Sequence, residues 1–329
     1  MKIIGMILLF LPTLALAEFV TVSGISSGAY MAQQFQLAHS ASVSGAGVIA
    51  GGPFFCARNQ ILDALNRCMK TGLGLPRGDE SVAEARRAEE AGEIDSLNNL
   101  THARILVLAG TEDQTVLPQV GEVLVKTYRE LGIPPENLRF INDLKIGHAF
   151  PTEGFGNPCP TPSQSPYLSK CGRDMAGEIL THLLGPLTPK LSPVEEHLKT
   201  YEQLSFTELE EERANLSLGK KGYAYVPEGC EAGNCRIHVA FHGCKQTLDD
   251  IQESFIRNAG YNAWAEANRI IILYPQAVKS YVPNNPNGCW DWWGYTGRNY
   301  HTKLAPQMKV IMRNIEDLKR GQLNFLPLH

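Results

Sequence analysis

The stretch that most constrains this chain is VSGISSGAYM, which reads as a strand, a sharp turn and a helix. Gly24, Ser26 and Gly28 form a GxSxG pattern at the turn. In such an elbow the serine is strained and exposed, and a Cβ at either glycine would collide with a neighbouring strand or helix. The pattern also occurs in ordinary turns, but residues 19–22 are β-branched or aromatic and residues 30–38 contain helix formers without Gly or Pro. We therefore predict that Ser26 is a catalytic nucleophile.

The first residues have the features of a secretory signal peptide. One Lys precedes an apolar run over residues 3–16, and Ala17 stands directly before a glutamate. We expect cleavage after Ala17, so that residues 1–17 are the signal peptide and the mature protein is secreted or periplasmic. The apolar run is short for a membrane span, and no later segment is apolar enough to provide one. The formal charge of -4 gives no indication of a nucleic-acid partner.

Eight cysteines in an exported chain indicate disulfide bonds. They occur as neighbours along the sequence, and the hypothesis is the following pairing: Cys56 with Cys68, Cys159 with Cys171, Cys230 with Cys235, and Cys244 with Cys289. Other connectivities remain open, since spacing alone does not determine them. A zinc site is disfavoured, because the chain has no CxxC and no histidine at metal-ligand spacing to a cysteine pair. We expect neither a metal nor a cofactor.

Strand-like and helix-like segments alternate through the first half of the chain. Apolar runs predict strands at 45–52, 104–109 and 138–141, and helical sequence lies between them at 59–69, 81–97 and 119–131. This alternation with short connections predicts a doubly wound, mostly parallel α/β sheet. Catalytic groups in such sheets gather at the carboxyl ends of the strands.

Asp113 and His148 each follow a predicted strand, as Ser26 does, and the order Ser, Asp, His is that of the α/β-hydrolases. A serine hydroxyl is a poor nucleophile until an imidazole takes its proton, and the imidazole needs a buried carboxylate to hold its tautomer. Glu112 and Asp143 are alternatives to Asp113, and a loop carboxylate is often only a helix cap. Among the nine histidines, His148 alone combines this chain order with a position at a strand end.

The second half begins with a change of composition. Residues 186–219 contain three prolines and an acidic patch, and we interpret them as a solvated connector within a single catalytic domain, 18–329. Strand-like sequence then resumes at 222–227, 236–244 and 270–274, with a helix predicted over 247–268.

The turn His242-Gly243-Cys244 carries the second signal. In α/β-hydrolases an HG turn supplies one backbone N–H of the oxyanion hole, and the residue after the nucleophile supplies the other. Here these donors would be Cys244 and Ser27. The HG turn normally precedes the nucleophile but here follows it, which predicts a circularly permuted α/β-hydrolase fold.

The last predicted helix is consistent with this permutation. Residues 308–318 carry one apolar stripe, and Gly321 is placed as a C-terminal cap. In the unpermuted order this helix would lead into the strand that begins near Phe19. Chain termini that lie close together make such a rearrangement physically easy.

Five segments together resemble a known family: GISSGAYMA, YAYVPEGC, RIHVAFHGCKQT, ILYPQA and GCWDWWGY. They are similar to the secreted poly(3-hydroxybutyrate) depolymerases of the single-domain, circularly permuted type, and to the wider esterase group that includes feruloyl and acetyl-xylan esterases. The resemblance spans nearly the whole mature chain. It implies an α/β-hydrolase with Ser26, Asp113 and His148 as triad and the amides of Ser27 and Cys244 as oxyanion hole.

The resemblance also implies a disulfide, because in the family one tends to join the HGC turn to the CW segment, here Cys244 to Cys289. No second substrate-binding domain and no Ser/Thr-rich linker is recognisable in the sequence. Adsorption to a solid surface is therefore not implied.

Trp290, Trp292 and Trp293 place three of the four tryptophans within four residues. Core packing is one interpretation. The preceding segment 282–288 reads as a loop, however, and indoles beside a loop would suit an apolar polyester chain. We expect at least one of these tryptophans to line the substrate cleft, and we also assign Tyr30, just after the elbow, to substrate binding.

These observations predict a secreted, monomeric serine esterase that cleaves poly(3-hydroxybutyrate) or its oligomers through an acyl-enzyme. The runner-up is a short-chain or feruloyl/acetyl-xylan-type carboxylesterase acting on small esters. A hypothesis of another class is an inactive hydrolase-fold binding protein. Such a protein would usually lack a triad member, whereas all three candidates are present here.

Overall fold

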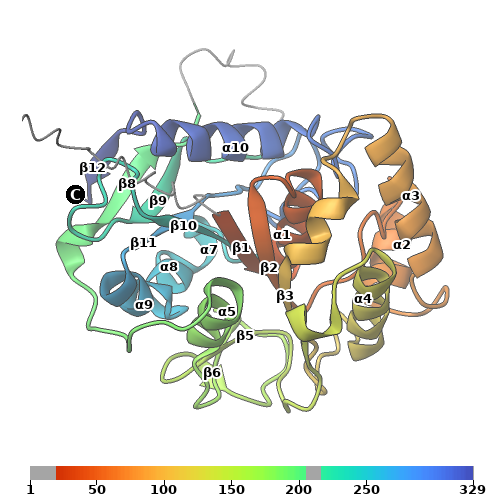
Figure 1. The fold of residues 1–329 in the computed structure, drawn as a ribbon. Helices are drawn as coiled ribbons and strands as arrows, with labels where there is room; N and C mark the ends of the chain where they lie inside the picture. The colour runs from red at the N-terminus through yellow and green to blue at the C-terminus, as the bar shows by residue number, and fades with distance from the viewer. Residues whose placement is uncertain (1–19, 205–215, 329) are drawn as a thin grey trace, which may run out of the picture.

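A nine-stranded sheet, in the order β12-β8-β9-β11-β10-β1-β2-β3-β4, runs through the middle of the protein (Figure 1). The structure is a computed structural model and describes residues 20–204 and 216–328. The strands of this sheet are β1 (Val20–Ile25), β2 (Val43–Ile49), β3 (Arg104–Leu108), β4 (Leu138–Ile141), β8 (Leu198–Glu202), β9 (Lys221–Tyr225), β10 (Arg236–Phe241), β11 (Ile270–Tyr274) and β12 (Phe325–Pro327). The expected signal peptide and the acidic patch of the connector lie outside the described residues.

The pairing of the strands shows the predicted permutation. All pairs from β11 through β10, β1, β2 and β3 to β4 are parallel, while β9, β8 and β12 add antiparallel pairs at one edge. If the chain ran from β11 into β1, its strands would follow one another as β8, β9, β10, β11, β1, β2, β3 and β4. Numbered 1 to 8 in that sequence, they lie across the sheet in the order 1-2-4-3-5-6-7-8, and β12 lies outside them at the edge. This is the strand order of an α/β-hydrolase whose chain begins at its fifth strand.

Helices cover both faces of the sheet (Figure 1). They are α1 (Ser27–Ala38), α2 (Ile61–Asp63), α3 (Gly78–Glu90), α4 (Pro118–Glu130), α5 (Met175–Leu184), α7 (Leu248–Ile251), α8 (Ser254–Asn258), α9 (Tyr261–Asn268) and α10 (Pro306–Lys319). Helices α1, α3, α4 and α10 contribute to one large hydrophobic cluster, and α5, α8 and α9 contribute to a second. The molecule is thus a three-layer α/β/α fold.

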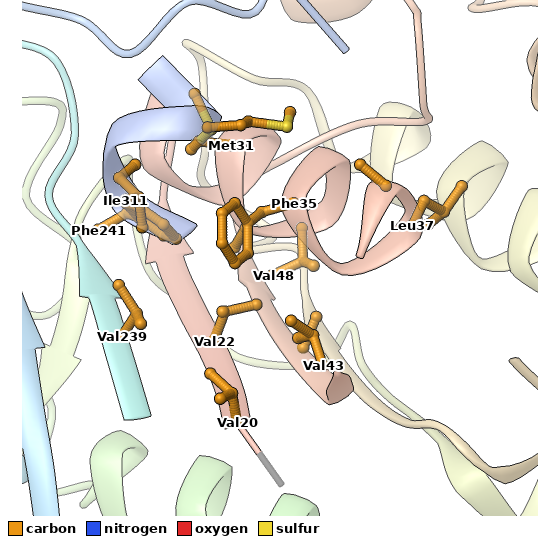
Figure 2. Close-up of a cluster of buried hydrophobic side chains, with 14 of the residues drawn as sticks. Val20, Val22, Met31, Phe35, Leu37, Val43, Val48, Val239, Phe241 and Ile311 are labelled. Atoms are coloured by element: carbon orange, nitrogen blue, oxygen red, sulfur yellow. The ribbon is translucent and has the colours of Figure 1, made fainter. Parts of the chain in front are cut away.

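The first of these clusters fixes the helix that carries the nucleophile turn. Figure 2 shows Phe35 of α1 among side chains of β1, β2 and β10, with Ile311 of α10 beside them. Phe35, Val22 and Phe241 are fully buried. Burying a side chain of this size stabilises the fold by about 1.5–3 kcal/mol, so α1 is held rigidly against the sheet.

The predicted helix over 247–268 is wrong in its continuity, because the chain forms three short helices there. Gln252, between α7 and α8, has φ 51°, and Gly260, between α8 and α9, has φ 100°. An α-helix cannot pass through residues with positive φ. The hydrophobic pattern located the helical region but not its breaks.

The predicted connector over 186–219 is wrong in part, because it contains strand β8. Leu198 and Tyr201 are buried, and β8 pairs antiparallel with β9 along its whole length. The strand has five residues, and two of them are a lysine and a glutamate, so its pattern is weak.

Three short strands form a second, small sheet: β5 (Phe150–Thr152), β6 (Asn157–Pro158) and β7 (Leu168–Lys170). The Cys159–Cys171 disulfide closes this unit. The other disulfides join the pairs that neighbour order predicts: Cys56–Cys68, Cys230–Cys235 and Cys244–Cys289. Within the part of the chain that the structure describes, no helix has the length and apolar character to cross a bilayer.

Candidate active site

Ser26 sits in the turn between β1 and α1, with φ 56° and ψ -123°. A side chain at Gly24 would meet the Gly28 carbonyl oxygen at 2.2 Å, and one at Gly28 would meet the Phe241 and His242 carbonyl oxygens at 2.4 Å. Both contacts are with backbone, which cannot move aside. The two glycines are therefore required by close approach of helix α1 to its own turn and to β10, as a nucleophile elbow demands.

His148 and Asp113 are bonded to each other beside this turn. The Nδ1–H of His148 donates to Asp113 Oδ2 at 2.8 Å, and both side chains are buried. The other carboxylate oxygen of Asp113 accepts the backbone N–H groups of Thr115 and Val116 at 2.8 and 2.9 Å. The carboxylate is thereby fixed on both sides, and it determines which ring nitrogen of His148 carries the proton.

The two alternative carboxylates do not take this position. Glu112 and Asp143 are exposed, and neither is bonded to His148. Asp113 binds the backbone of the turn that follows it, but the helix-cap interpretation is wrong, because α4 begins only at Pro118 and its N-cap is Leu117. One oxygen of the Asp113 carboxylate accepts hydrogen bonds from the backbone, and the other accepts one from the His148 imidazole.

Ser26 and His148 line one cavity of about 690 Å³. This volume lies within the range of ~300–1,000 Å³ that is usual for small-molecule sites. His148 Nε2 makes no hydrogen bond within residues 20–204 and 216–328, so this nitrogen is available to a group in the cavity. The arrangement supplies a hydroxyl, an imidazole and a carboxylate in the order that nucleophilic catalysis requires.

The HG turn lies directly against the elbow. A Cβ on Gly243 would stand 3.3 Å from the Cβ of Ser26, and both Gly243 and Cys244 line the cavity. In the described residues, the N–H groups of Ser27 and Cys244 have no acceptor within the chain. Two backbone donors without an acceptor therefore flank Ser26, an arrangement that could bind a developing oxyanion.

The three tryptophans have different surroundings. Trp292 and Trp293 line the cavity, whereas Trp290 is fully buried against Phe241 and His242, at ring-centroid distances of 5.1 and 5.5 Å. The assignment of Trp290 to substrate binding is therefore not supported by its position. Its indole packs against β10 and the HG turn, one residue after the disulfide-bonded Cys289.

Tyr30 also lies behind the cavity wall rather than on it. The ring stacks on Trp292 with centroids 4.3 Å apart and an interplanar angle of 15°. Its hydroxyl donates to the Cys68 carbonyl oxygen, and burial raises the pKa of Tyr30 well above its usual value. Tyr30 supports Trp292 and has no exposed surface to offer a substrate.

The loop that carries the tryptophans is held by one carboxylate. Asp291 is buried and accepts the backbone N–H groups of Trp293, Gly294, Tyr295 and Thr296, together with the Thr296 hydroxyl. Burial raises the pKa of Asp291, and these hydrogen bonds oppose that shift. Hydrogen bonds to the buried Asp291 thus fix the backbone of Trp293 and Tyr295, which form part of the cavity wall.

Several cavity residues were not identified from the sequence. They include Ile61, Leu65 and Met69, Tyr167 and Gln246, and the prolines and asparagines of 283–287. Ile61 and Leu65 are 48% and 45% exposed, and they lie in a helical stretch with no local sign of function. The loop 282–288 was the one available signal, since it is rich in Pro, Asn and Gly beside the tryptophans.

A second group of polar side chains lies under the sheet and away from the cavity. His238 bonds to the Thr21 hydroxyl at 2.8 Å and to the Ser23 hydroxyl at 2.7 Å, and Ser23 also bonds to Tyr261. Burial lowers the pKa of His238 to about 3. This histidine is a satisfied core residue. Within the described chain, no cluster of three His, Cys, Asp or Glu side chains is arranged to hold a metal ion.

Comparisons with known proteins place this geometry in a family, although no protein-family model matches the chain. The chain is 36% identical over 316 residues to the polyhydroxybutyrate depolymerase of Talaromyces funiculosus, and the match covers 92% of this chain and 90% of that relative. It is 39% identical over 305 residues to the poly(3-hydroxybutyrate) depolymerase of Delftia acidovorans, and it spans 60% of that relative's length.

Solved structures give the same result. The crystal structure of a PHB depolymerase from Penicillium funiculosum matches with a TM-score of 0.83 and 34% identity, covering 93% of this chain and 96% of that one. A PHB depolymerase complexed with an R3HB trimer matches equally well. Since fold, chain order and sequence agree over nearly the full length of these proteins, this chain belongs to the polyhydroxybutyrate depolymerase family.

Proposed function

We propose that this protein is a serine esterase that hydrolyses poly(3-hydroxybutyrate) or its oligomers through an acyl-enzyme. The observation that carries the proposal is the shared cavity: Ser26, strained at its elbow, and His148, held by Asp113, both line it. Relatives that carry the name depolymerase, and a related structure that holds an R3HB trimer, support the substrate class.

In the first half-reaction, Ser26 Oγ attacks the ester carbonyl carbon while His148 Nε2 accepts the hydroxyl proton. Asp113 stabilises the imidazolium that forms. The carbonyl oxygen becomes an oxyanion and receives hydrogen bonds from the Ser27 and Cys244 N–H groups. The alcohol end of the substrate leaves with the proton from His148, and the acyl group remains on Ser26.

In the second half-reaction, water takes the place of the alcohol. His148 removes a proton from the water, the hydroxide attacks the acyl carbon, and Ser26 Oγ leaves with that proton. The product is a carboxylic acid. Both halves use the same serine, imidazole, carboxylate and backbone donors.

The cavity wall suits a polyester with methyl side groups. Ile61, Leu65 and the two indoles offer apolar surface, and the exposed Asn284 and Asn287 offer amide donors for ester carbonyls. Apolar walls with a few placed polar groups are typical of sites that fix the orientation of a mostly apolar ligand.

The place of action is part of the proposal. Four disulfides suit an oxidising compartment, and the sequence predicts cleavage after Ala17, to leave a secreted or periplasmic monomer. N-terminal sequencing of the exported protein and its mass by light scattering test these two points. A mature protein that begins elsewhere, or a stable dimer, would contradict them.

The decisive experiment is Ser26→Ala, compared with Ser44→Ala as a control. Ser44 lies on β2, makes only a weak 3.4 Å hydrogen bond to the Val20 carbonyl, and does not line the cavity. Ser26→Ala should lower turnover by several orders of magnitude with the fold intact, while Ser44→Ala remains active. Release of 3-hydroxybutyrate from polymer films should exceed release of ferulate from bran, and the reverse preference would favour a feruloyl-type esterase.

A further inference from the structure

The peptide unit between Gly243 and Cys244 is held in one orientation. The His242 ring donates from Nδ1 to the Gly243 carbonyl oxygen at 2.8 Å, and the Gln246 N–H reaches the same oxygen at 3.3 Å. This peptide bond is trans, since the cis bonds of the described chain are at Pro166 and Pro283. In a trans peptide the C=O and N–H point in opposite directions. Fixing the carbonyl therefore also fixes the Cys244 N–H.

The proton on His242 is placed by a second hydrogen bond. Nε2 accepts the backbone N–H of Ala277 at 3.1 Å, so this nitrogen carries no proton and Nδ1 must carry it. The ring is buried and packs against Trp290. Burial lowers the pKa of His242 to about 4, which keeps the ring neutral near pH 7. A neutral ring with a proton on Nδ1 is a permanent donor to the Gly243 carbonyl.

The other side of Gly243 is held by Gln246. The Gly243 N–H donates to Gln246 Oε1 at 2.7 Å, and the Gln246 amide donates to the Pro166 and Tyr167 carbonyl oxygens at 3.0 and 3.3 Å. Gln246 is buried and bridges the HG turn to the segment that carries Tyr167. Both ends of the glycine are therefore held by hydrogen bonds, at a position where an added Cβ would stand only 3.3 Å from the Cβ of Ser26.

We propose that His242 and Gln246 are positioning residues of the oxyanion hole, which hold the Gly243–Cys244 peptide so that the Cys244 N–H is directed at the reacting carbonyl. This inference rests on the proposed function, because it needs an oxyanion beside Ser26. If the peptide rotated, the Gly243 carbonyl oxygen would replace the N–H donor and repel the oxyanion. Loss of one such donor costs about 10²–10³-fold in kcat.

The test compares His242→Asn with His242→Gln. The amide nitrogen of asparagine can take the place of Nδ1 and donate to the Gly243 carbonyl, whereas the longer glutamine places its amide near Nε2 and cannot. We expect His242→Gln to lower kcat on a soluble butyrate ester by about 10²-fold with little change in KM. His242→Asn should remain within about tenfold of the unmodified enzyme, because it keeps this donor.

A tetrahedral mimic separates positioning from a merely structural role. An alkyl boronic acid adds to Ser26 Oγ and places a boronate oxygen in the oxyanion hole. Its inhibition constant should rise in His242→Gln in proportion to the fall in kcat. His39→Gln is the matched control: His39 is also a buried histidine but lies outside the cavity, so its replacement should lower stability without changing kcat.

If His242→Gln does not fold, Gln246→Glu and Gln246→Met make the same comparison, since only the glutamate keeps an acceptor for the Gly243 N–H. A folded His242→Gln or Gln246→Met with unchanged kcat, or with reduced kcat and unchanged boronate affinity, overturns the inference. An active Ser26→Ala would instead overturn the proposed function, so the two failures are distinguishable.

Discussion

The Asp113 carboxylate divides its two oxygens between the backbone and His148, with the imidazole Nδ1 at 2.8 Å. Replacing it by asparagine keeps the shape but puts an amide where a proton acceptor is needed. We expect Asp113→Asn to lower kcat by about 10⁴-fold, because the imidazole takes the wrong tautomer. The measurement is kcat on a soluble ester, and Asp143→Asn, which changes an exposed carboxylate, should leave it unaltered.

The elbow glycines should tolerate no side chain. A Cβ at position 28 would stand 2.4 Å from two backbone oxygens of β10 and the HG turn. We expect Gly28→Ala to cost at least ~3 kcal/mol in the free energy of unfolding, since the backbone must shift. Gly154→Ala is the control, because nothing lies within 4 Å of its Cβ position. Urea unfolding of both variants tests this, and equal stabilities would contradict it.

Alanine substitutions at Trp293 and Trp290 should affect different properties, substrate binding in the first case and stability in the second. Trp293 is half-buried on the cavity wall, so Trp293→Ala should raise KM for oligomers about tenfold, or ~1.4 kcal/mol. Trp290 is fully buried, so Trp290→Ala should instead lower the free energy of unfolding by about 3–5 kcal/mol. Kinetics and unfolding of both variants give the comparison. A Trp293→Ala enzyme with unaltered KM would remove this residue from the binding wall.

Of the four disulfides, Cys244–Cys289 should contribute most to the free energy of unfolding and to kcat. It closes a separation of 45 residues and joins the HG turn to the tryptophan loop, whereas Cys230–Cys235 closes only 5. In the chain-entropy model the two differ, at about 4 and about 2 kcal/mol. We expect the Cys244→Ala/Cys289→Ala variant to lose more stability than Cys230→Ala/Cys235→Ala, and also to lose kcat. Similar losses of stability and no loss of kcat would argue against a role in the turn.

Stability should fall as the solution becomes acidic, because His238 is buried neutral. Its pKa is lowered to about 3 in the fold, against an ordinary value of 6.5, so the unfolded chain binds the proton first. Its contribution is fully present above pH 6.5 and is lost as pH falls toward 3, by up to ~1.4 kcal/mol per pH unit. Urea unfolding at pH 7 and pH 5 should show a smaller pH dependence in His238→Gln. If the free energy of unfolding depends on pH equally in His238→Gln and the unmodified protein, the acid sensitivity arises from other groups.

The parts of the site that local sequence determines could be predicted. The GxSxG pattern itself indicates the elbow at Gly24 and Gly28. The carboxyl ends of strands in a parallel sheet share one edge, which predicts that Asp113 and His148 lie beside it. The HG turn indicates the permutation because it follows the GxSxG segment in the chain instead of preceding it. The observed strand order around β1 and β10 agrees with that prediction.

What depends on distant packing could not be predicted. Trp290 and Trp293 are three residues apart in one segment, and their sequence does not reveal that Trp290 packs against Phe241 of β10 whereas Trp293 lines the cavity. Ile61 and Leu65 lie in a helical segment whose sequence gives no sign of function. Only the tertiary structure places them in the same cavity as the loop at 283–287. Strand β8 has too few residues for its alternation to stand out against a proline-rich neighbourhood.

The pairing of β1 with β10 has a consequence for synthesis. Val20 of β1 pairs with Ile237 of β10, so β1 is synthesised more than two hundred residues before the strand that it pairs with. Until then the nascent chain carries an open strand edge, which invites association with other chains. Ser26 and the HG turn at 242–244 are likewise far apart in the chain, so the cavity that both line can be completed only after Tyr295, which also lines it, has been synthesised.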